Sequence, residues 1–441
     1  MNALASRGDR VRAFVRDPSE VAFPARVEVR RLDLMSANIA DIAAELVGLD
    51  AVCHLAGESV SGRWTEEKKR KIHDSRELTT RNLVTAMWEC PVRPPVLACA
   101  SASGYYGSRG DEPLDESSRP GGDFLAHVCI DWEREAQVAE EFGTRVVRLR
   151  QGLVLGRDGG ALAAMLPPFR ACLGGPMGSG RQWWPWIHLE DAVAAWIFVV
   201  DREDVSGAFN AAAPDPATSA RFAQALGHAL GRPALTPAPG VALRVVLGEF
   251  AESLLASQLL LPAVAQDKGF VWKHPHLESA LIDLLDRSGR RSPRTQRFAA
   301  AELVHTPLSK VFAFFSDPGN LEALTPGSLR LEIQTPLPVE MRRGATIDYR
   351  LRVGSIPLRW KTLVTRWDPP LGFEDIALRG PYQLWRHEHR FETREDASVE
   401  VSDAVEYSLG LAPLSDVALP TVRRNLERLF AYRATRLRSL L

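Results

Sequence analysis

The sequence predicts an α/β domain built on a doubly wound parallel sheet, followed by a second domain of the α+β class. Over about the first 230 residues, short apolar runs alternate with amphipathic helical stretches, which is typical of a parallel sheet covered on both faces. From residue 298 onward, alternating strand patterns follow one another and a long amphipathic helix ends the chain. The length of 441 residues accommodates two or three such domains.

Each expected element of the first domain has its own pattern. The expected strands are the apolar runs at 12–15, 50–55, 96–100 and 145–149, and the expected helices are 39–46, 66–88 and 124–141. In open parallel sheets, ligands bind outside the carboxyl ends of the strands. Functional residues are therefore expected directly after these four runs.

The second domain is expected to combine an antiparallel sheet with a long helix. Its strand patterns lie at 298–305, 329–334, 346–353, 358–367, 383–392 and 399–409, and its helical patterns lie at 308–324 and 422–440. Such a sheet can leave an apolar cavity against the helix, which is a common kind of ligand site. His387 and His389 share one face of their strand with Trp385 and Phe391. The two histidines could hold a metal, but no third ligand is evident, so core or cavity-lining roles are favoured and no metal is expected.

Composition excludes several classes of protein. Hydrophobic residues make up 45% and charged residues 25%, a balance that rules out a disordered or collagen-like chain. The net charge is −1, so no overall field favours nucleic acid or an anionic membrane as a partner. We interpret the scarcity of lysine beside abundant arginine and alanine as the codon bias of a GC-rich bacterial genome.

Five widely spaced cysteines form no C-x-x-C pair, so a disulfide framework or a structural zinc site is not expected. No apolar run reaches 18 residues, and the first ten residues lack the apolar stretch of a signal peptide. We therefore expect a cytoplasmic protein without a membrane span.

Several motifs occur at the expected strand ends and in the segment that follows. They are HLAGES at 54–59, SASGYYG at 101–107, GLVLGRDGGAL at 152–162, GGPMGSGRQWWPWIH at 174–188 and KGFVWKHPHLESAL at 268–281. In this order they resemble the extended short-chain dehydrogenase/reductase superfamily, and more narrowly its nucleotide-sugar-epimerase-like "epimerase family" branch with a DUF1731-type tail. The resemblance implies a Rossmann-like fold that binds a nicotinamide dinucleotide.

The start of the chain departs from that resemblance. Dinucleotide-binding domains open with a strand and a Gly-rich turn that cradles the phosphates. Here the first residues resemble the end of the first helix, a turn at Gly8 and then the second strand, so the first strand and its glycines are missing from this sequence. We expect a start codon assigned too late, with an in-frame extension of roughly 15–20 residues that encodes this strand and turn. The alternative is a domain that has lost its phosphate loop.

The resemblance assigns cofactor contacts to five residues. Arg16 ends the second strand of the fold, where an arginine accommodates the 2′-phosphate of NADP, so NADP is the expected cofactor. Leu55, Ala56 and Gly57 form the loop after the next strand, and Arg76 lies in the helix behind it. The alternatives are surface arginines and a purely structural turn.

The superfamily's catalytic dyad is absent. A lysine in Y-x-x-x-K lowers the pKa of the tyrosine, which then acts as general acid or base. In this sequence the two positions carry Leu125 and Cys129. The remaining catalytic candidates, after the strand at 96–100, are Ser101, Ser103, Tyr105 and Tyr106.

A cluster of aromatic residues occurs where the superfamily builds its substrate lobe. The candidates are Arg181, Trp183, Trp184, Trp186 and His188. The aromatic rings could stack on a flat or sugar-like substrate, with Arg181 and His188 providing polar contacts. A packed interface between the lobe and the sheet is an equal alternative.

The last segment resembles the START-like helix-grip superfamily, also called SRPBCC or polyketide-cyclase-type domains. Its markers are VFAFFSDPGNLEALTP at 311–326, RGPYQLWRHEHRF at 379–391 and FAYRATRL at 430–437. The domain prediction is then a Rossmann-like domain at 1–235, a substrate-lobe tail at 236–286, an Arg-rich linker at 287–297 and a ligand-binding domain at 298–441.

Two functions remain open on the sequence. The first is an NADP-dependent epimerase or oxidoreductase of an unknown small molecule, fused to a domain that binds an apolar ligand. The second is a non-catalytic NADP-binding sensor or scaffold, which the missing dyad favours.

Overall fold

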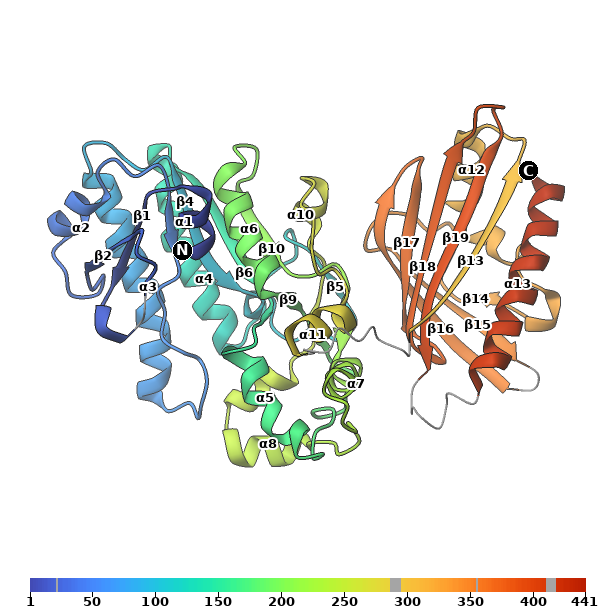
Figure 1. Ribbon diagram of the computed structural model, residues 1–441, viewed down its shortest axis with the longest axis horizontal. Coiled ribbons are helices and arrows are strands. Elements are labelled where there is room, and N and C mark those ends of the chain that lie inside the picture. The colour runs from blue at the N-terminus through green and yellow to red at the C-terminus, as the bar shows by residue number, and fades with distance from the viewer. Residues whose placement is uncertain (21–22, 286–294, 354–355, 410–417) are drawn as a thin grey trace. The chain divides into compact units, whose positions relative to one another are not determined.

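The computed structural model describes residues 1–20, 23–285, 295–353, 356–409 and 418–441 (Figure 1). The chain divides into two compact units, Met1–Arg290 and Arg291–Leu441. The Arg-rich linker predicted at 287–297 lies mostly outside the described residues. Among the described helices, none has the length and apolar character needed to span a bilayer.

The N-terminal unit contains a four-stranded parallel sheet in the order β10-β6-β4-β3, and a separate parallel pair, β1-β2. The strands of this unit are β1 (Val11–Val15), β2 (Val27–Arg31), β3 (Val52–His54), β4 (Val96–Ala102), β5 (Pro113–Leu114), β6 (Arg145–Gln151), β7 (Leu153–Leu155), β8 (Trp183–Trp184), β9 (Trp186–His188), β10 (Gly207–Ala211), β11 (Ala217–Thr218) and β12 (Leu259–Leu260). The helices are α1 (Asn2–Arg7), α2 (Ile39–Leu46), α3 (Glu66–Glu89), α4 (Phe124–Gln137), α5 (Gly160–Arg170), α6 (Leu189–Asp201), α7 (Ser219–Leu230), α8 (Gly240–Leu247), α9 (Phe250–Leu255), α10 (Ala263–Asp267) and α11 (Leu277–Leu285).

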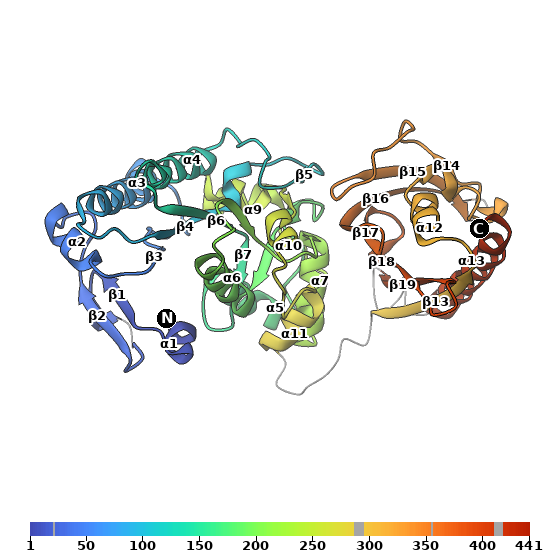
Figure 2. The same cartoon turned by 90° about the horizontal axis from the view of Figure 1, so that it is seen from above.

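Helices cover both faces of the four-stranded sheet (Figure 2). Alternate residues of β4 point to opposite faces, so Leu97 and Cys99 pack against α3 and α4 while Ala98 packs against α6. Both faces are therefore apolar, as a buried parallel sheet requires. This is the doubly wound α/β arrangement that the alternating pattern predicts.

The local predictions for this unit hold at most elements. The predicted helix end and turn at the start of the chain are α1 and Gly8, whose φ of 103° lies in the left-handed region that glycine adopts easily. The helix 39–46 agrees with α2 at both ends. Strand β2 escaped prediction because three of its five residues are charged, which suits a strand paired on one side only.

The C-terminal unit is a seven-stranded antiparallel sheet in the order β13-β19-β18-β17-β16-β15-β14, with a long helix packed on it. Its strands are β13 (Gln296–Val304), β14 (Glu332–Ile333), β15 (Thr346–Val353), β16 (Ile356–Asp368), β17 (Gly372–Arg379), β18 (Tyr382–Thr393) and β19 (Val399–Leu409), and its helices are α12 (Leu308–Phe315) and α13 (Leu419–Leu440). Leu426, Phe430 and Leu437 of α13 are buried in the core against the sheet.

Two predictions for this unit were wrong in their extent, and one strand was missed. The helix predicted at 308–324 ends at Phe315, because Pro318 follows closely and disfavours a helical residue before it. The strand predicted at 329–334 is reduced to the two residues of β14. Strand β17 was not predicted, since Glu374 and Asp375 interrupt its apolar pattern.

Candidate functional site

The loop after β3 is exposed, and the residue before it, His54, is buried and bonded to helix α3. Leu55 is 57% exposed, whereas His54 is buried with its Nε2 2.9 Å from Thr80 Oγ1 of α3. Burial lowers the pKa of His54 to about 4, so the ring is neutral at physiological pH. The strand end is thus fixed to α3 while Leu55, Ala56 and Gly57 remain open to a ligand.

Two consecutive residues of α3 hold this loop. The backbone N–H of Glu58 donates to Ser75 Oγ at 2.8 Å. The guanidinium of Arg76 lies against Gly57, where a Cβ would come within 3.1 Å of Arg76 Cζ, so a larger residue would displace the arginine. The tip of Arg76 therefore lies in contact with Gly57, and a side chain at residue 57 would require that tip to move by a few tenths of an ångström.

In the part of the chain that the structure describes, the guanidinium of Arg76 forms no ion pair with a carboxylate. Its Nη1 donates to Ile72 O at 2.9 Å, and its Cζ lies 5.1 Å from the centroid of the Trp132 ring. No carboxylate of the described residues lies within ion-pair distance of this half-buried guanidinium, and burial lowers its pKa. A buried charge normally has a counter-charge, so an anion bound beside Gly57 would provide the negative counter-charge of Arg76.

Arg16 is an exposed residue at the carboxyl end of β1. The pKa of Glu58 is lowered mainly by Lys68, whose Nζ lies 2.7 Å from Glu58 Oε1, and Arg16 adds to this shift. The charge of Arg16 therefore acts on Glu58 of the loop 55–58, where the resemblance places the cofactor.

The hydroxyl of Ser101 is engaged in a hydrogen bond inside the protein. It donates to Glu133 Oε1 at 2.7 Å, and the same carboxylate accepts from Arg150 Nε and Nη2 at 2.8 and 2.9 Å. All three residues are buried, with exposed fractions of 2–3%. Ser101 is placed at a strand end as predicted, but its proton lies in a closed ion-pair network.

Tyr106 takes part in the same buried network as Ser101, whereas the hydroxyl of Tyr105 stays outside it. Tyr106 is fully buried, donates to Asn210 Oδ1 at 2.7 Å and accepts from Arg150 Nη1 at 2.9 Å, and burial raises the pKa of its hydroxyl. Tyr105 stacks its ring on the Arg150 guanidinium at 3.4 Å from Cζ to the ring centroid. Among the described residues, the side-chain hydroxyls of Tyr105 and Ser103 have no hydrogen-bond partner, and both residues are half-buried.

Leu125 and Cys129, at the positions that the resemblance gives to the catalytic dyad, face this turn. Gly104 packs on Leu125 and Cys129, since a Cβ there would lie 3.3 Å from Leu125 Cβ and 3.9 Å from Cys129 Sγ. Burial raises the pKa of the Cys129 thiol to about 12, so the thiol is not a nucleophile at neutral pH. No group at either position can transfer a proton there.

The aromatic cluster of the second lobe is packed inside the unit. Trp183, Trp184 and Trp186 are 1–8% exposed, and their indole N–H groups donate to Asp111 Oδ1, Leu254 O and Asp215 O. These contacts favour the packed-interface alternative over stacking on a substrate. Arg181 remains exposed.

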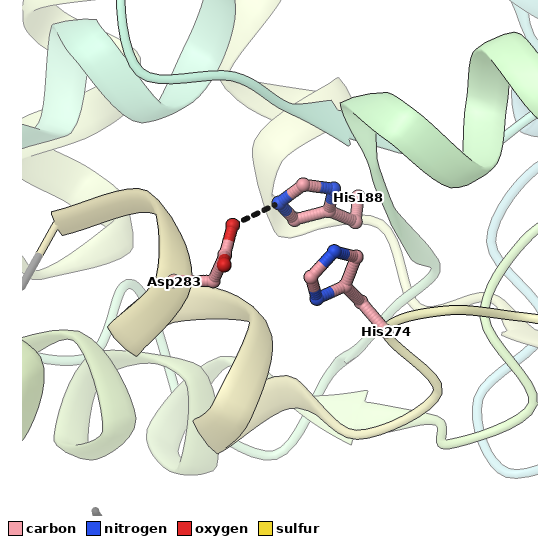
Figure 3. A group of neighbouring side chains, drawn as sticks. All are labelled: His188, His274 and Asp283. Atoms are coloured by element: carbon pink, nitrogen blue, oxygen red, sulfur yellow. Dashed lines mark ion pairs between the residues drawn. The ribbon is translucent and has the colours of Figure 1, made fainter. Parts of the chain in front are cut away.

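His188 lies in a small cluster with His274 and Asp283 (Figure 3). The two rings stack at 3.8 Å between centroids, and His188 Nε2 lies 3.4 Å from Asp283 Oδ2. His188 Nδ1 accepts the N–H of Glu190 at the start of α6, so the ring proton is on Nε2. That nitrogen is therefore not free to bind a metal as a neutral ligand.

Several residues around these groups were not predicted. Glu133, Arg150 and Asn210 close the network under Ser101 and Tyr106, and Asp283 comes to His188 from about 95 residues further along the chain. A charged residue inside an apolar strand, as in RVVRLRQ at 145–151, was the one signal that could have indicated such a buried ion pair.

Comparison with known proteins places both parts of the N-terminal unit. The NAD dependent epimerase/dehydratase family matches residues 1–212, and the domain of unknown function DUF1731 matches residues 238–284. The chloroplastic epimerase family protein SDR39U1 homolog of Arabidopsis thaliana is 42% identical over 236 residues, which cover 53% of this chain and 68% of the relative. An epimerase family protein of Mycobacterium leprae is 40% identical, over 54% of this chain and 77% of the relative.

Solved structures agree with this placement. The human epimerase family protein SDR39U1 (isoform 2), crystallised with NADPH, is 33% identical with a TM-score of 0.58, over 65% of this chain and 94% of the human chain. The UDP-glucose 4-epimerase of Thermus thermophilus, 19% identical over 64% of this chain and 92% of its own with a TM-score of 0.51, shares the fold. The chain therefore belongs to the epimerase family of short-chain-dehydrogenase-like proteins and carries that family's DUF1731 segment.

Proposed function

We propose that the N-terminal unit binds NADP(H), with the loop 55–57 and the side chains of Arg16 and Arg76 as its contacts. The observation that carries this proposal is the Arg76 guanidinium, half-buried on Gly57 without a carboxylate partner among the described residues. The human relative with NADPH supports the choice of cofactor. Arg16 would meet the 2′-phosphate, and Arg76 would neutralise charge beside the loop.

Binding measurements on the full chain test this assignment. We expect NADPH to bind well ahead of NADH in calorimetric titrations. Arg16→Ala should reduce that preference by about 1–3 kcal/mol, and Arg76→Ala should weaken both cofactors by a similar amount, the scale of a hydrogen bond to a charged group. Arg93→Ala is the control, because this exposed arginine precedes β4 at the opposite end of the strand. Equal affinity for both cofactors in the parent chain would refute the proposal.

For chemistry on a small-molecule substrate, Tyr105 and Ser103 are the hydroxyl groups that the network leaves available. The reaction class we propose is an NADP-dependent epimerisation or oxidoreduction. Turnover of NADPH with a metabolite extract tests it, and Tyr105→Phe should abolish the turnover while binding of NADPH stays unchanged. Tyr106→Phe should instead lower stability, since its hydroxyl bridges Asn210 and Arg150.

A second candidate function is an NADP-binding sensor or scaffold without turnover. The apolar Leu125 and the protonated Cys129 at the dyad positions favour it. NADPH binding without any turnover in the same extract would select this function.

For the C-terminal unit we propose a helix-grip domain that binds an apolar ligand. Its support is the seven-stranded antiparallel sheet with α13 packed on it, together with buried aromatic residues such as Phe315, Trp360 and Phe391. The proposed partners of the whole protein are thus two small molecules, without nucleic acid or a membrane span.

A further inference from the structure

A row of inward-facing residues on β19 contains one acidic member. Val399, Val401, Val405 and Tyr407 alternate along the strand and are buried, and Asp403 occupies the central position of the same row at 5% exposure. A buried carboxylate in an apolar row requires compensating partners. Its partners come from β18 and α13.

Asp403 contacts one nitrogen of each of two histidines. His387 Nε2 lies 3.0 Å and His389 Nδ1 lies 2.8 Å from Asp403 Oδ1, the first as a hydrogen bond and the second without hydrogen-bond alignment. Arg433 of α13 adds its charge, with Nη1 3.7 Å from the same oxygen. This carboxylate therefore favours the ring protons on His387 Nε2 and His389 Nδ1.

The opposite nitrogens of both rings then carry lone pairs, and both face a second, partly buried carboxylate. His387 Nδ1 lies 4.0 Å and His389 Nε2 lies 3.8 Å from Asp375 Oδ2 of β17. Three acceptor atoms thus converge within 4.8 Å of one another. With the ring protons on the side of Asp403, these three acceptors repel one another, and a cation between them would remove that repulsion.

We propose that Asp375, His387 and His389 bind one divalent transition-metal ion in the C-terminal unit, with Asp403 orienting the two histidines. Two imidazoles and one carboxylate are a donor set for zinc or iron(II) that leaves coordination positions open. Ligating histidines characteristically give their other N–H to a carboxylate. Asp403 accepts from His387 Nε2 in this way, and its charge lies 2.8 Å from His389 Nδ1. Metal–ligand bonds of about 2.0–2.1 Å place donor atoms about 3.0–3.5 Å apart. The two histidine nitrogens, now 3.8 and 4.0 Å from Asp375 Oδ2, would therefore have to move toward it by roughly 0.3–1.0 Å when the ion binds.

Aromatic rings surround the two histidines, as expected for an interior metal site and not for an exposed ionic cluster. The rings of Phe373 and Phe315 lie 4.3 and 5.8 Å from that of His389, and Phe430 lies 5.7 Å from His387, all between centroids. The site revises the expectation of no metal: the third ligand lies on β17, the strand that sequence reasoning missed.

The contrast with the His188 cluster sharpens the assignment. There, a backbone N–H occupies Nδ1 of His188 and forces the ring proton onto the nitrogen that faces Asp283. In the C-terminal unit, the nitrogens that face Asp375 are the ones that can be free of protons. His274→Asn is therefore a histidine control that should leave metal binding unchanged.

The test is metal binding to the full chain after treatment with a chelator. Equilibrium dialysis with Zn²⁺, and anaerobically with Fe²⁺, should give about one ion per chain, and competition between the ions identifies the preferred one. Asp375→Asn and His389→Gln should each weaken binding at least tenfold. Asp403→Asn should weaken it about 10–100-fold, the usual effect of losing a carboxylate behind a ligating histidine. Asp348→Asn, on β15 of the same sheet and half-exposed, should have no effect.

X-ray absorption on the unaltered chain provides a second measurement. It needs no variant, so it is independent of whether the variants fold. The spectrum of bound zinc should show two imidazoles, with oxygen and without sulfur. Sulfur ligands, fewer than two imidazoles, no stoichiometric binding of either ion, or undiminished binding in Asp375→Asn and His389→Gln would overturn the proposal. In the absence of binding, a proton shared with Asp375 would be the cation between the three acceptors.

Discussion

Replacing Glu133 by glutamine tests whether the ion pair under the candidate site is what keeps Arg150 buried. The carboxylate accepts from Ser101 Oγ and from two nitrogens of Arg150 at 2.7–2.9 Å, and Arg148 Nη1 lies 3.6 Å away. Glutamine keeps the volume but removes the charge. Arg150, at 3% exposure, would then be a buried guanidinium without a counter-charge.

The magnitude follows from this burial. Removing one partner of a buried pair typically costs about 3–5 kcal/mol. At roughly 2–4 °C per kcal/mol for a domain of this size, the transition of the N-terminal unit should fall by roughly 6–20 °C. Glu135→Gln on the same helix is the matched control, because its partner Arg81 is 47% exposed and such pairs contribute about 0.2–1 kcal/mol.

Differential scanning calorimetry of the full chain measures both variants. The transition that moves in Glu133→Gln identifies the N-terminal unit, and the other transition should stay in place because the two units are separate compact bodies. A shift in Glu133→Gln no larger than in Glu135→Gln would show that Tyr106 and the backbone compensate Arg150 without the carboxylate, and would refute the reasoning.

Three further predictions concern pH and the C-terminal unit. His54 has a native pKa of about 4, below the ordinary 6.5, so the unfolded chain takes up the proton first as the pH falls. The free energy of unfolding should therefore fall by about 1.4 kcal/mol per pH unit from pH 6.5 toward 4. Denaturant titrations should show a smaller fall in His54→Asn, and an equal fall would contradict the shift. Leu426→Ala removes a buried contact between α13 and the sheet and should cost about 2–5 kcal/mol in the C-terminal transition alone, so a shift of both transitions would argue against independent units. Residues 298–441 expressed alone should melt cooperatively. A fatty acid, isoprenoid or aromatic polyketide that binds the native state should raise the melting temperature by mass action, and its binding should change tryptophan fluorescence. A folded domain indifferent to all of them would contradict the ligand-binding proposal.

Local sequence patterns determined the elements that are apolar and paired on both sides. The strand predicted at 399–409 is β19 to the residue, because a period-2 apolar pattern leaves one register in which the buried face is continuous. The same patterns failed at β2 and β17, whose charged residues interrupt the apolar alternation. An edge strand satisfies such charges in water. In β17, Asp375 instead lies beside His387 and His389, and Glu374 contacts Arg386 and Thr365.

The sequence by itself determined the family, the doubly wound parallel sheet, the antiparallel sheet with its long helix, and the placement of Ser101 and Gly57 at strand ends. Only the tertiary structure decided what those residues can do. It joined Ser101 to Glu133, laid Arg76 on Gly57 and brought Asp375 and Asp403 to either side of two histidines. Periodicity reports which face of one element is apolar, whereas a polar site depends on the register between neighbouring strands and on which helix covers them, and no single segment of the chain contains that information.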